Sequence, residues 1–175
     1  YLMMEALEGE SLDKRLRRGG VSLDDVRRIL EQCCSALTAS HGKGIVHRDL
    51  KPANIFLCNY GFDPLFVKLL DFGTAKLTAP VPGQRRTVFG MVLGTPAFMS
   101  PEQCEGRGAI DHRSDIYSLG VVLYQMLTGT LPFDGEVRQV MLAHLRDTPQ
   151  PPRARNPSVP PAWEALCLHM MEKAR

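Results

Sequence analysis

The longest helical pattern in the sequence follows Ser22. Its apolar positions, three or four residues apart, are Val26, Leu30, Cys33 and Leu37. Ser22 with Asp25 three residues later is typical of a helix N-terminus, and Gly42 and Gly44 are typical of a helix end. The pattern therefore predicts one long helix between these two signals.

Three later segments also have helical patterns. Asp115 to Leu127 is apolar nearly all round and ends at Thr128-Gly129, which predicts a buried helix. Glu136 to Arg146 is amphipathic, and its expected buried face comprises Val137, Val140, Met141 and Leu145. A last helix is expected around Trp163, Leu166, Met170 and Met171. Residues 149–161 contain six prolines and are expected to be irregular.

Short apolar runs predict strands. Tyr1 to Leu7 is expected to be a buried strand that leads into a connector. Asn54 to Leu57 and Phe66 to Leu70 flank the turn-rich residues 59–64, which predicts a hairpin. Residues 74–98 show little periodicity and predict a long loop, and loops of this length are usually functional.

Composition narrows the class of protein. The 175 residues are 44% hydrophobic with a net charge of +2 and mixed signs, as in an ordinary soluble domain, so nucleic acid is not an expected partner. Five cysteines without a C-x-x-C pair argue against a disulfide framework or a zinc site. The most apolar run, Tyr117 to Leu127, is about half as long as a membrane span requires, so no membrane segment is expected.

Candidate chemistry is concentrated in residues 47–54, which read H-R-D-L-K-P-A-N. Asp49, Lys51 and Asn54 supply an acid, a cation and an amide, the functions that phosphoryl transfer needs to orient a hydroxyl, offset charge and hold metal ions. Taken singly, each of these residues is more often part of a solvated turn. Asp71, in D-F-G at the end of the other hairpin arm, adds a second carboxylate opposite Asn54.

Together these motifs resemble the eukaryotic-type (Hanks-type) serine/threonine protein kinase family. Residues 94–102, G-T-P-A-F-M-S-P-E, resemble the end of the family's activation segment, with Ser100 where alanine is commoner. Residues 113–120 resemble the start of its central helix, and F-M-S-P-E-Q is similar to the bacterial branch. The resemblance implies a mainly α (α+β) fold, a helical kinase C-terminal lobe with short β-hairpins at its active-site face.

The resemblance also implies roles for individual residues. Asp49 would orient the acceptor hydroxyl, Lys51 would neutralise charge near the γ-phosphate of ATP, and Asn54 and Asp71 would hold Mg²⁺. Lys51 and Thr95 are similar to the residues of serine/threonine rather than tyrosine kinases. The implied partners are ATP and protein substrates with serine or threonine acceptors. The expected location is cytoplasmic, with a membrane-anchored parent protein that holds this domain in the cytoplasm as the alternative.

Further ATP contacts are implied beside Lys51, Asn54 and Asp71. They involve Met4 at the gatekeeper position, the backbones of Glu5 and Leu7 at the adenine edge, Phe56 below adenine and Leu70 before Asp71. Simple core burial is the alternative for all of the apolar residues in this set. An ordinary turn residue is the alternative for Thr95.

Two neighbours of Asp49 have implied roles as well. His47 is expected to pack against Phe72 rather than to act as a base. Arg48 resembles the arginine that binds a phosphorylated activation loop, so Thr87 or Thr78 is expected to be the phosphate acceptor. A plain solvated loop is the alternative for that segment.

The family's glycine-rich loop, strand lysine and helical glutamate have no counterpart in these 175 residues. We therefore expect residues 1–175 to be a partial kinase domain without the N-terminal β lobe, with residues 71–102 as its activation segment. Glu102 is expected to lack its usual arginine partner, because Arg175 comes about three residues early. Weak nucleotide binding and negligible turnover are expected from these residues alone. A pseudokinase or binding module, and a small-molecule phosphotransferase, are the alternatives.

Overall fold

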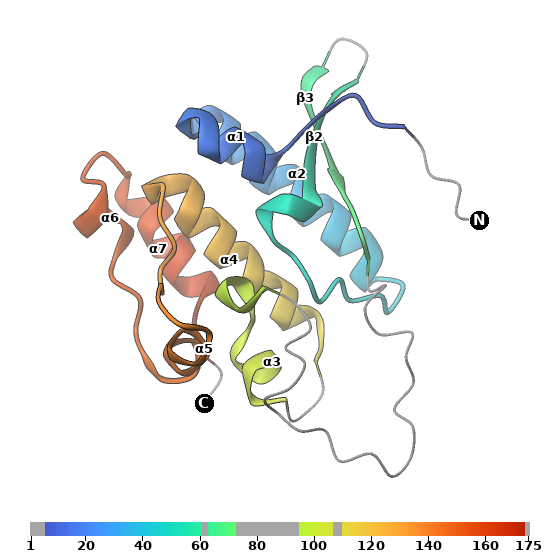
Figure 1. The fold of residues 1–175 in the computed structure, drawn as a ribbon. Coiled ribbons are helices and arrows are strands. Elements are labelled where there is room, and N and C mark those ends of the chain that lie inside the picture. Colours follow the sequence, from blue (N-terminus) through green and yellow to red (C-terminus); the bar gives the residue numbers. More distant parts are fainter. Residues whose placement is uncertain (1–5, 61–62, 73–94, 107–109, 174–175) are drawn as a thin grey trace.

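The computed structural model describes residues 6–60, 63–72, 95–106 and 110–173, which form a mainly helical body with a small sheet at one side (Figure 1). The elements are β1 (Gly9–Ser11), α1 (Leu12–Gly19), α2 (Leu23–His41), the 3-10 turn η1 (Pro52–Asn54), β2 (Ile55–Tyr60), β3 (Asp63–Leu69), the 3-10 turn η3 (Pro96–Phe98), α3 (Pro101–Glu105), α4 (His112–Thr128), α5 (Val137–Arg146), α6 (Pro152–Arg155) and α7 (Pro161–Met170).

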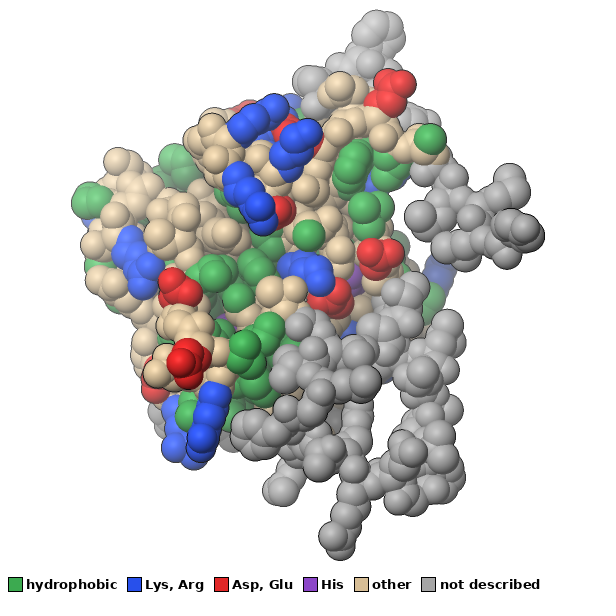
Figure 2. All heavy atoms as spheres, in the orientation of Figure 1, with side chains coloured by type: hydrophobic (Ala, Val, Ile, Leu, Met, Phe, Trp, Pro, Cys, Tyr) green, Lys and Arg blue, Asp and Glu red, His purple; other side chains and the backbone are tan. Residues whose placement is uncertain are grey.

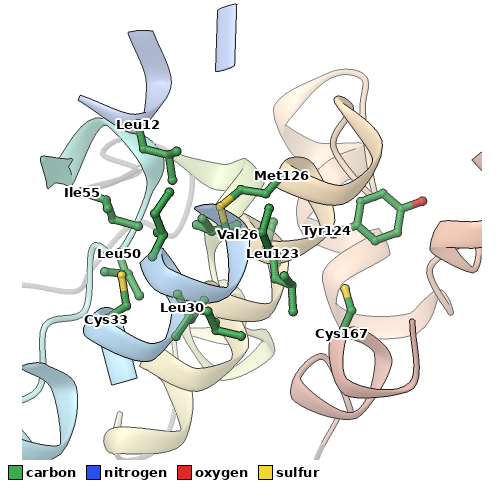
Figure 3. Packing of buried hydrophobic residues seen from close by; sticks show 14 of the residues in the cluster. Leu12, Val26, Leu30, Cys33, Leu50, Ile55, Leu123, Tyr124, Met126 and Cys167 are labelled. Carbon is green, nitrogen blue, oxygen red and sulfur yellow. The ribbon is translucent and has the colours of Figure 1, made fainter. Parts of the chain in front are cut away.

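The two longest helices, α2 and α4, form the centre of the body and confirm two of the predicted helices. The Ser22 hydroxyl accepts a hydrogen bond of 3.1 Å from the backbone N–H of Asp25, so α2 begins where the capping pattern predicts. Gly129 ends α4 in the left-handed conformation, with φ of 74°. Figure 3 shows apolar side chains of both helices meeting in the core, including Val26 and Leu123.

The last helix, α7, lies beside α4 because a glycine allows close approach (Figure 1). A Cβ atom added to Gly120 would lie 2.9 Å from both Met170 Cβ and Met171 Cγ, closer than carbon atoms pack. Cys167 of α7 is fully buried at the same interface. The expected helix around Trp163 is confirmed, although Leu166 is 41% exposed and does not belong to its buried face.

The sheet is antiparallel, with strand order β1-β2-β3, and it confirms the predicted hairpin. A side chain of α2 binds the edge of β3 that faces away from β2. The amide of Gln32 donates to the Leu65 carbonyl and accepts from the Val67 N–H, both at 2.9 Å. This pair of bonds fixes the hairpin against α2. The strand expected at residues 1–7 falls largely outside the described residues, and Ala6 and Leu7 are not in a strand.

The expected buried face of α5 is partly wrong. Val137 is 51% exposed, while Val140 and His144 are buried. Val137 is the first residue of the helix, after the N-cap Glu136, and the helix packs against α3 and η3. His144 was not expected on the buried face. Its hydrogen-bond partners come from other parts of the chain, and the local pattern does not contain them.

Three short helices were also not predicted. Residues 149–161 contain one helical turn, α6, because Pro152 is its first residue and a helix needs no N–H there. The pattern of α1 is mainly charged, and Figure 2 shows Lys and Arg side chains gathered over this helix. The five-residue α3 is too short for a periodic pattern. Within the described residues, no helix has the length and apolar character to cross a membrane.

Candidate active site

The H-R-D-L-K-P-A-N segment forms a loop between α2 and β2, and two of its apolar residues anchor it in the core. Leu50 is 1% exposed and points into the cluster that Figure 3 shows, and Pro52 is buried at the start of η1. Asp49 and Lys51 flank Leu50 and remain partly exposed, at 31% and 22% of their side chains. Burial of every second residue in this stretch therefore presents Asp49 and Lys51 at the surface.

Asp115, in the first turn of α4, ties the loop backbone to the central helix. Its Oδ2 accepts a hydrogen bond of 2.8 Å from the His47 N–H, and its Oδ1 accepts one of 2.8 Å from the Arg48 N–H. His41 Nε2 at the end of α2 lies 2.7 Å from the same Oδ2. Asp115 is fully buried, so these bonds replace the water that its carboxylate loses.

Two residues of the site have left-handed backbone conformations that are uncommon for side chains with a Cβ. Arg48 has φ of 68°, and Asp71 has φ of 56°. Each lies next to or within a motif that the sequence predicts to be catalytic. Such conformations persist where surrounding contacts fix them, and they are common at active sites.

Asp49, Lys51 and Asn54 converge on one carboxylate oxygen. Lys51 Nζ lies 2.8 Å from Asp49 Oδ2, and Asn54 Nδ2 donates to the same oxygen at 3.2 Å and to the Asp49 carbonyl at 2.8 Å. These bonds orient the Asn54 amide with its nitrogen toward Asp49. The Asn54 oxygen is therefore the atom left for another ligand.

His47 connects this cluster to the D-F-G motif. Its Nε2 donates to the Leu70 carbonyl at 2.8 Å, and its Nδ1 accepts from the Asp49 N–H at 3.3 Å. Its ring lies 4.7 Å from the ring of Phe72, which confirms the expected packing. Both nitrogens are occupied and the side chain is fully buried, so the geometry favours a structural role.

The backbone adds a second connection between the two motifs. The Leu70 N–H donates to the Asn54 carbonyl at 2.8 Å, directly before Asp71. Asn54 and Asp71 are thus attached to paired ends of the β2-β3 hairpin, as the sequence predicts.

Thr95 and Asp49 line one surface hollow, together with Leu50, Phe98 and Met99. Thr95 is exposed there. The turn that follows it is fixed from α4 by Ser118, whose hydroxyl donates to the Phe98 carbonyl at 2.7 Å.

Two buried residues, Tyr117 and His144, bind the turn η3 through the Ala97 carbonyl. His144 Nε2 donates to the Ala97 carbonyl at 3.1 Å, and Tyr117 donates its hydroxyl proton to His144 Nδ1 at 2.9 Å. Burial raises the pKa of Tyr117, so the phenol keeps this proton. Burial lowers the pKa of His144 to about 4, outweighing the Ala97 hydrogen bond, so the imidazole is neutral.

The predicted ATP contacts are only partly within the described residues. Phe56 on β2 and Leu70 after β3 are half-buried on the hairpin, and Leu7 is half-buried before β1. Met4 and Glu5 lie outside the described residues. Thr78 and Thr87, the expected phosphate acceptors, do so as well.

Glu102, which was expected to lack its usual arginine partner, accepts a hydrogen bond from the Ser114 hydroxyl. Ser114 is in the first turn of α4, 12 residues after Glu102 in the sequence. A neutral hydroxyl is thus a donor to Glu102 within the described residues. The expected lack of an arginine partner stays a prediction, because Arg175 lies outside them.

Comparison with known proteins agrees with this geometry. The sequence-family model described as protein kinase domain matches residues 1–174. The chain belongs to the protein kinase family. Among curated relatives of this kinase chain, serine/threonine-protein kinase pkn3 of Myxococcus xanthus is 43% identical over 99% of the chain and 32% of that protein.

Two other bacterial relatives give the same result. Serine/threonine-protein kinase Pkn1 of Myxococcus xanthus is 45% identical over 99% of the chain and 24% of its own length. Serine/threonine-protein kinase PknB of Mycobacterium tuberculosis is 38% identical, over 99% and 27%. The expected resemblance to bacterial serine/threonine kinases is confirmed. The kinase chain spans about a third or less of these relatives.

Asp115 is the important site residue that sequence reasoning did not assign. A carboxylate in a helical segment that is otherwise apolar nearly all round is a signal, because buried charges are found with partners. Which partners it has depends on the loop some 67 residues earlier, and the local pattern does not contain that information.

Proposed function

We propose that the protein carrying this chain transfers the γ-phosphate of ATP to serine and threonine hydroxyls of protein substrates. The observation that best supports this function is the cluster in which Lys51 and Asn54 both approach Asp49 Oδ2, at 2.8 and 3.2 Å. An acid, a cation and an amide are thereby assembled at Asp49, which also lines a small surface hollow.

In this proposal Asp49 orients the acceptor hydroxyl and receives its proton. Lys51 and Asn54 occupy Oδ2, so Oδ1 is the oxygen available to the hydroxyl. The Lys51 ammonium would then offset negative charge on the transferred phosphoryl group. Positioning and electrostatic stabilisation of this kind supply most of the rate in phosphoryl transfer.

Asn54 and Asp71 are the proposed Mg²⁺ ligands. Mg²⁺ prefers oxygen ligands, and the Asn54 amide oxygen and the exposed Asp71 carboxylate match that preference. Bound Mg²⁺ would neutralise phosphate charge and orient the phosphates. The hydrogen bond from Leu70 N–H to the Asn54 carbonyl supports a fixed spacing between the two ligands.

ATP would lie against the hairpin, with Phe56 and Leu70 on its apolar side and the backbones near Glu5 and Leu7 at the adenine edge. Met4 is the proposed gatekeeper. We propose residues 1–175 as a partial kinase domain and residues 71–102 as its activation segment. The whole protein would supply the glycine-rich loop and strand lysine, and would work in the cytoplasm, where ATP is abundant.

Thr95, next to Asp49 in the hollow, is proposed to select serine and threonine together with Lys51. We also propose that phosphorylation of the activation segment regulates the protein through Arg48. Its Nε is buried and has no hydrogen-bond partner among the described residues, which fits a guanidinium that awaits a phosphate on Thr87 or Thr78.

The test is transfer of radiolabel from γ-labelled ATP by the whole protein, with and without Mg²⁺, followed by identification of the labelled amino acid. We expect Mg²⁺-dependent phosphoserine and phosphothreonine. ATP binding without any transfer would instead indicate a pseudokinase. Label on a small molecule alone would indicate a small-molecule phosphotransferase.

A further inference from the structure

Both backbone polar groups of Arg48 are held by side chains from other elements. Its N–H donates to Asp115 of α4, and its carbonyl accepts a hydrogen bond of 2.6 Å from Gln103 Nε2 of α3. Arg48 has the left-handed φ of 68° and directly precedes Asp49. The two peptide groups that flank this strained residue are therefore each fixed by one bond, and the bond from Gln103 fixes the peptide that leads into Asp49.

The orientation of the Gln103 amide is determined by Ser100. Gln103 Oε1 accepts from the Ser100 N–H at 3.0 Å and from the Ser100 hydroxyl at 3.2 Å. A flipped amide would oppose the NH₂ group to the Ser100 N–H and the oxygen to the Arg48 carbonyl. Two repulsive contacts would replace two hydrogen bonds, so only the observed orientation satisfies all the groups.

Gln103 therefore links two parts of the site that are about fifty residues apart in sequence. One is the peptide before Asp49. The other is the segment from Thr95 to Ser100, of which Thr95, Phe98 and Met99 line the hollow beside Asp49. Gln103 lines this hollow too, although it does not reach the Asp49 carboxylate by any hydrogen bond found among the described residues.

We infer that Gln103 is a positioning residue, which sets the direction of the Asp49 carboxylate through the Arg48 carbonyl and couples it to the substrate-facing segment. This inference rests on the proposed function of Asp49. Loss of the Gln103 donor would release one side of the Arg48 peptide. Asp49 would then sample orientations in which its Oδ1 misses the acceptor hydroxyl, and small misplacements of this kind lower rates strongly.

The test compares Gln103→Glu and Gln103→Leu with Glu105→Gln in the whole protein. Glutamate keeps the size of the side chain and the acceptor for Ser100 but has no NH₂ group for the Arg48 carbonyl. Glu105 is exposed on the same short helix and is the matched control. The single-turnover rate of phosphoryl transfer is measured together with the KM for ATP and the melting temperature.

We expect both Gln103 variants to lower the single-turnover rate about 10- to 100-fold, with the KM for ATP changed less than about threefold. Hydrogen exchange in a peptide covering residues 46–52 should become faster in both variants and remain unchanged in Glu105→Gln. This second readout does not depend on catalysis. If the wild-type protein transfers no phosphate, the proposed function fails, while exchange still decides whether Gln103 holds the loop.

Rates within about twofold of the control would overturn the inference. Unchanged exchange at residues 46–52 in both Gln103 variants would overturn it as well. A variant with a slow rate and an equally large loss of ATP affinity would indicate general damage to the site and would also contradict a positioning role.

Discussion

Asp115 Oδ1 accepts a hydrogen bond of 2.8 Å from the backbone N–H of Arg48 and so connects the central helix α4 to the loop that carries Asp49. The other oxygen of Asp115 accepts from the neighbouring His47 N–H. One buried carboxylate thus satisfies two adjacent backbone donors, of which the His47 N–H is buried and the Arg48 N–H is partly buried.

Asp115→Asn tests this connection. Asparagine has one acceptor oxygen where the carboxylate has two, so its NH₂ group faces one of the two backbone N–H groups. We expect the free energy of unfolding to fall by about 2–4 kcal/mol and kcat to fall about 10- to 100-fold. Asp24→Asn is the control, because Asp24 also lies in a helical first turn but is exposed. Equal effects of the two substitutions would refute the connection.

Asp71→Asn tests the metal site. The substitution removes a charge from an exposed proposed ligand without changing its size. We expect the Mg²⁺ concentration for half-maximal activity to rise at least about tenfold. Asp134→Asn, at an exposed loop residue, should leave the Mg²⁺ titration unchanged. An unaltered titration in Asp71→Asn would exclude Asp71 as a ligand.

His144 predicts a pH dependence of stability. Its pKa is about 4 in the folded protein, lowered mainly by burial, whereas an unfolded chain has the ordinary value near 6.5. The unfolded state therefore binds the extra proton first as pH falls. The stabilising effect of neutral His144 is complete above about pH 6.5 and is lost toward pH 4, on the order of 3 kcal/mol in total.

Denaturant unfolding at several pH values measures this effect. His144→Gln removes the titrating group, so its stability should vary less between pH 6.5 and 4 than that of the wild type. His169→Gln, at an exposed histidine, should retain the wild-type slope. If His144→Gln has that slope too, another group causes the acid sensitivity.

Gly120→Ala tests the contact of α4 with α7. The added methyl group would lie 2.9 Å from Met170 Cβ, which belongs to the opposite helix and cannot rotate away. We expect a loss of about 1–3 kcal/mol in the free energy of unfolding. Gly42→Ala is the control, since Gly42 has φ of −60° and alanine adopts that conformation easily. A wild-type melting temperature in Gly120→Ala would mean that the helices pack less closely.

The sequence predicted the long elements and the residues of the catalytic loop, because both depend on local patterns. The spacing from Val26 to Leu37 predicted α2, and the motif around Asp49 placed Lys51 and Asn54 within a few residues of it. The family resemblance then assigned chemical roles to these positions.

The supports of the site were not predictable in the same way. Asp115 and Gln103 bind the loop across 67 and 55 residues of sequence, and the local pattern around each does not identify these partners. His144 falls on a face that hydrophobic spacing assigns to apolar residues, and its burial depends on Tyr117 and the Ala97 carbonyl. Contacts of this kind are determined by tertiary packing, which local periodicity does not encode.

The most direct test of the central claim is transfer of the γ-phosphate of ATP to a protein substrate by the whole protein and by its Asp49→Asn variant, with ATP affinity measured in parallel. The amide keeps the shape of Asp49 and its hydrogen bonds to Lys51 and Asn54 but is a poor proton acceptor. We predict ATP affinity within about threefold of the wild type and a rate at least about 100-fold lower. A rate close to that of the wild type would contradict the assignment of Asp49.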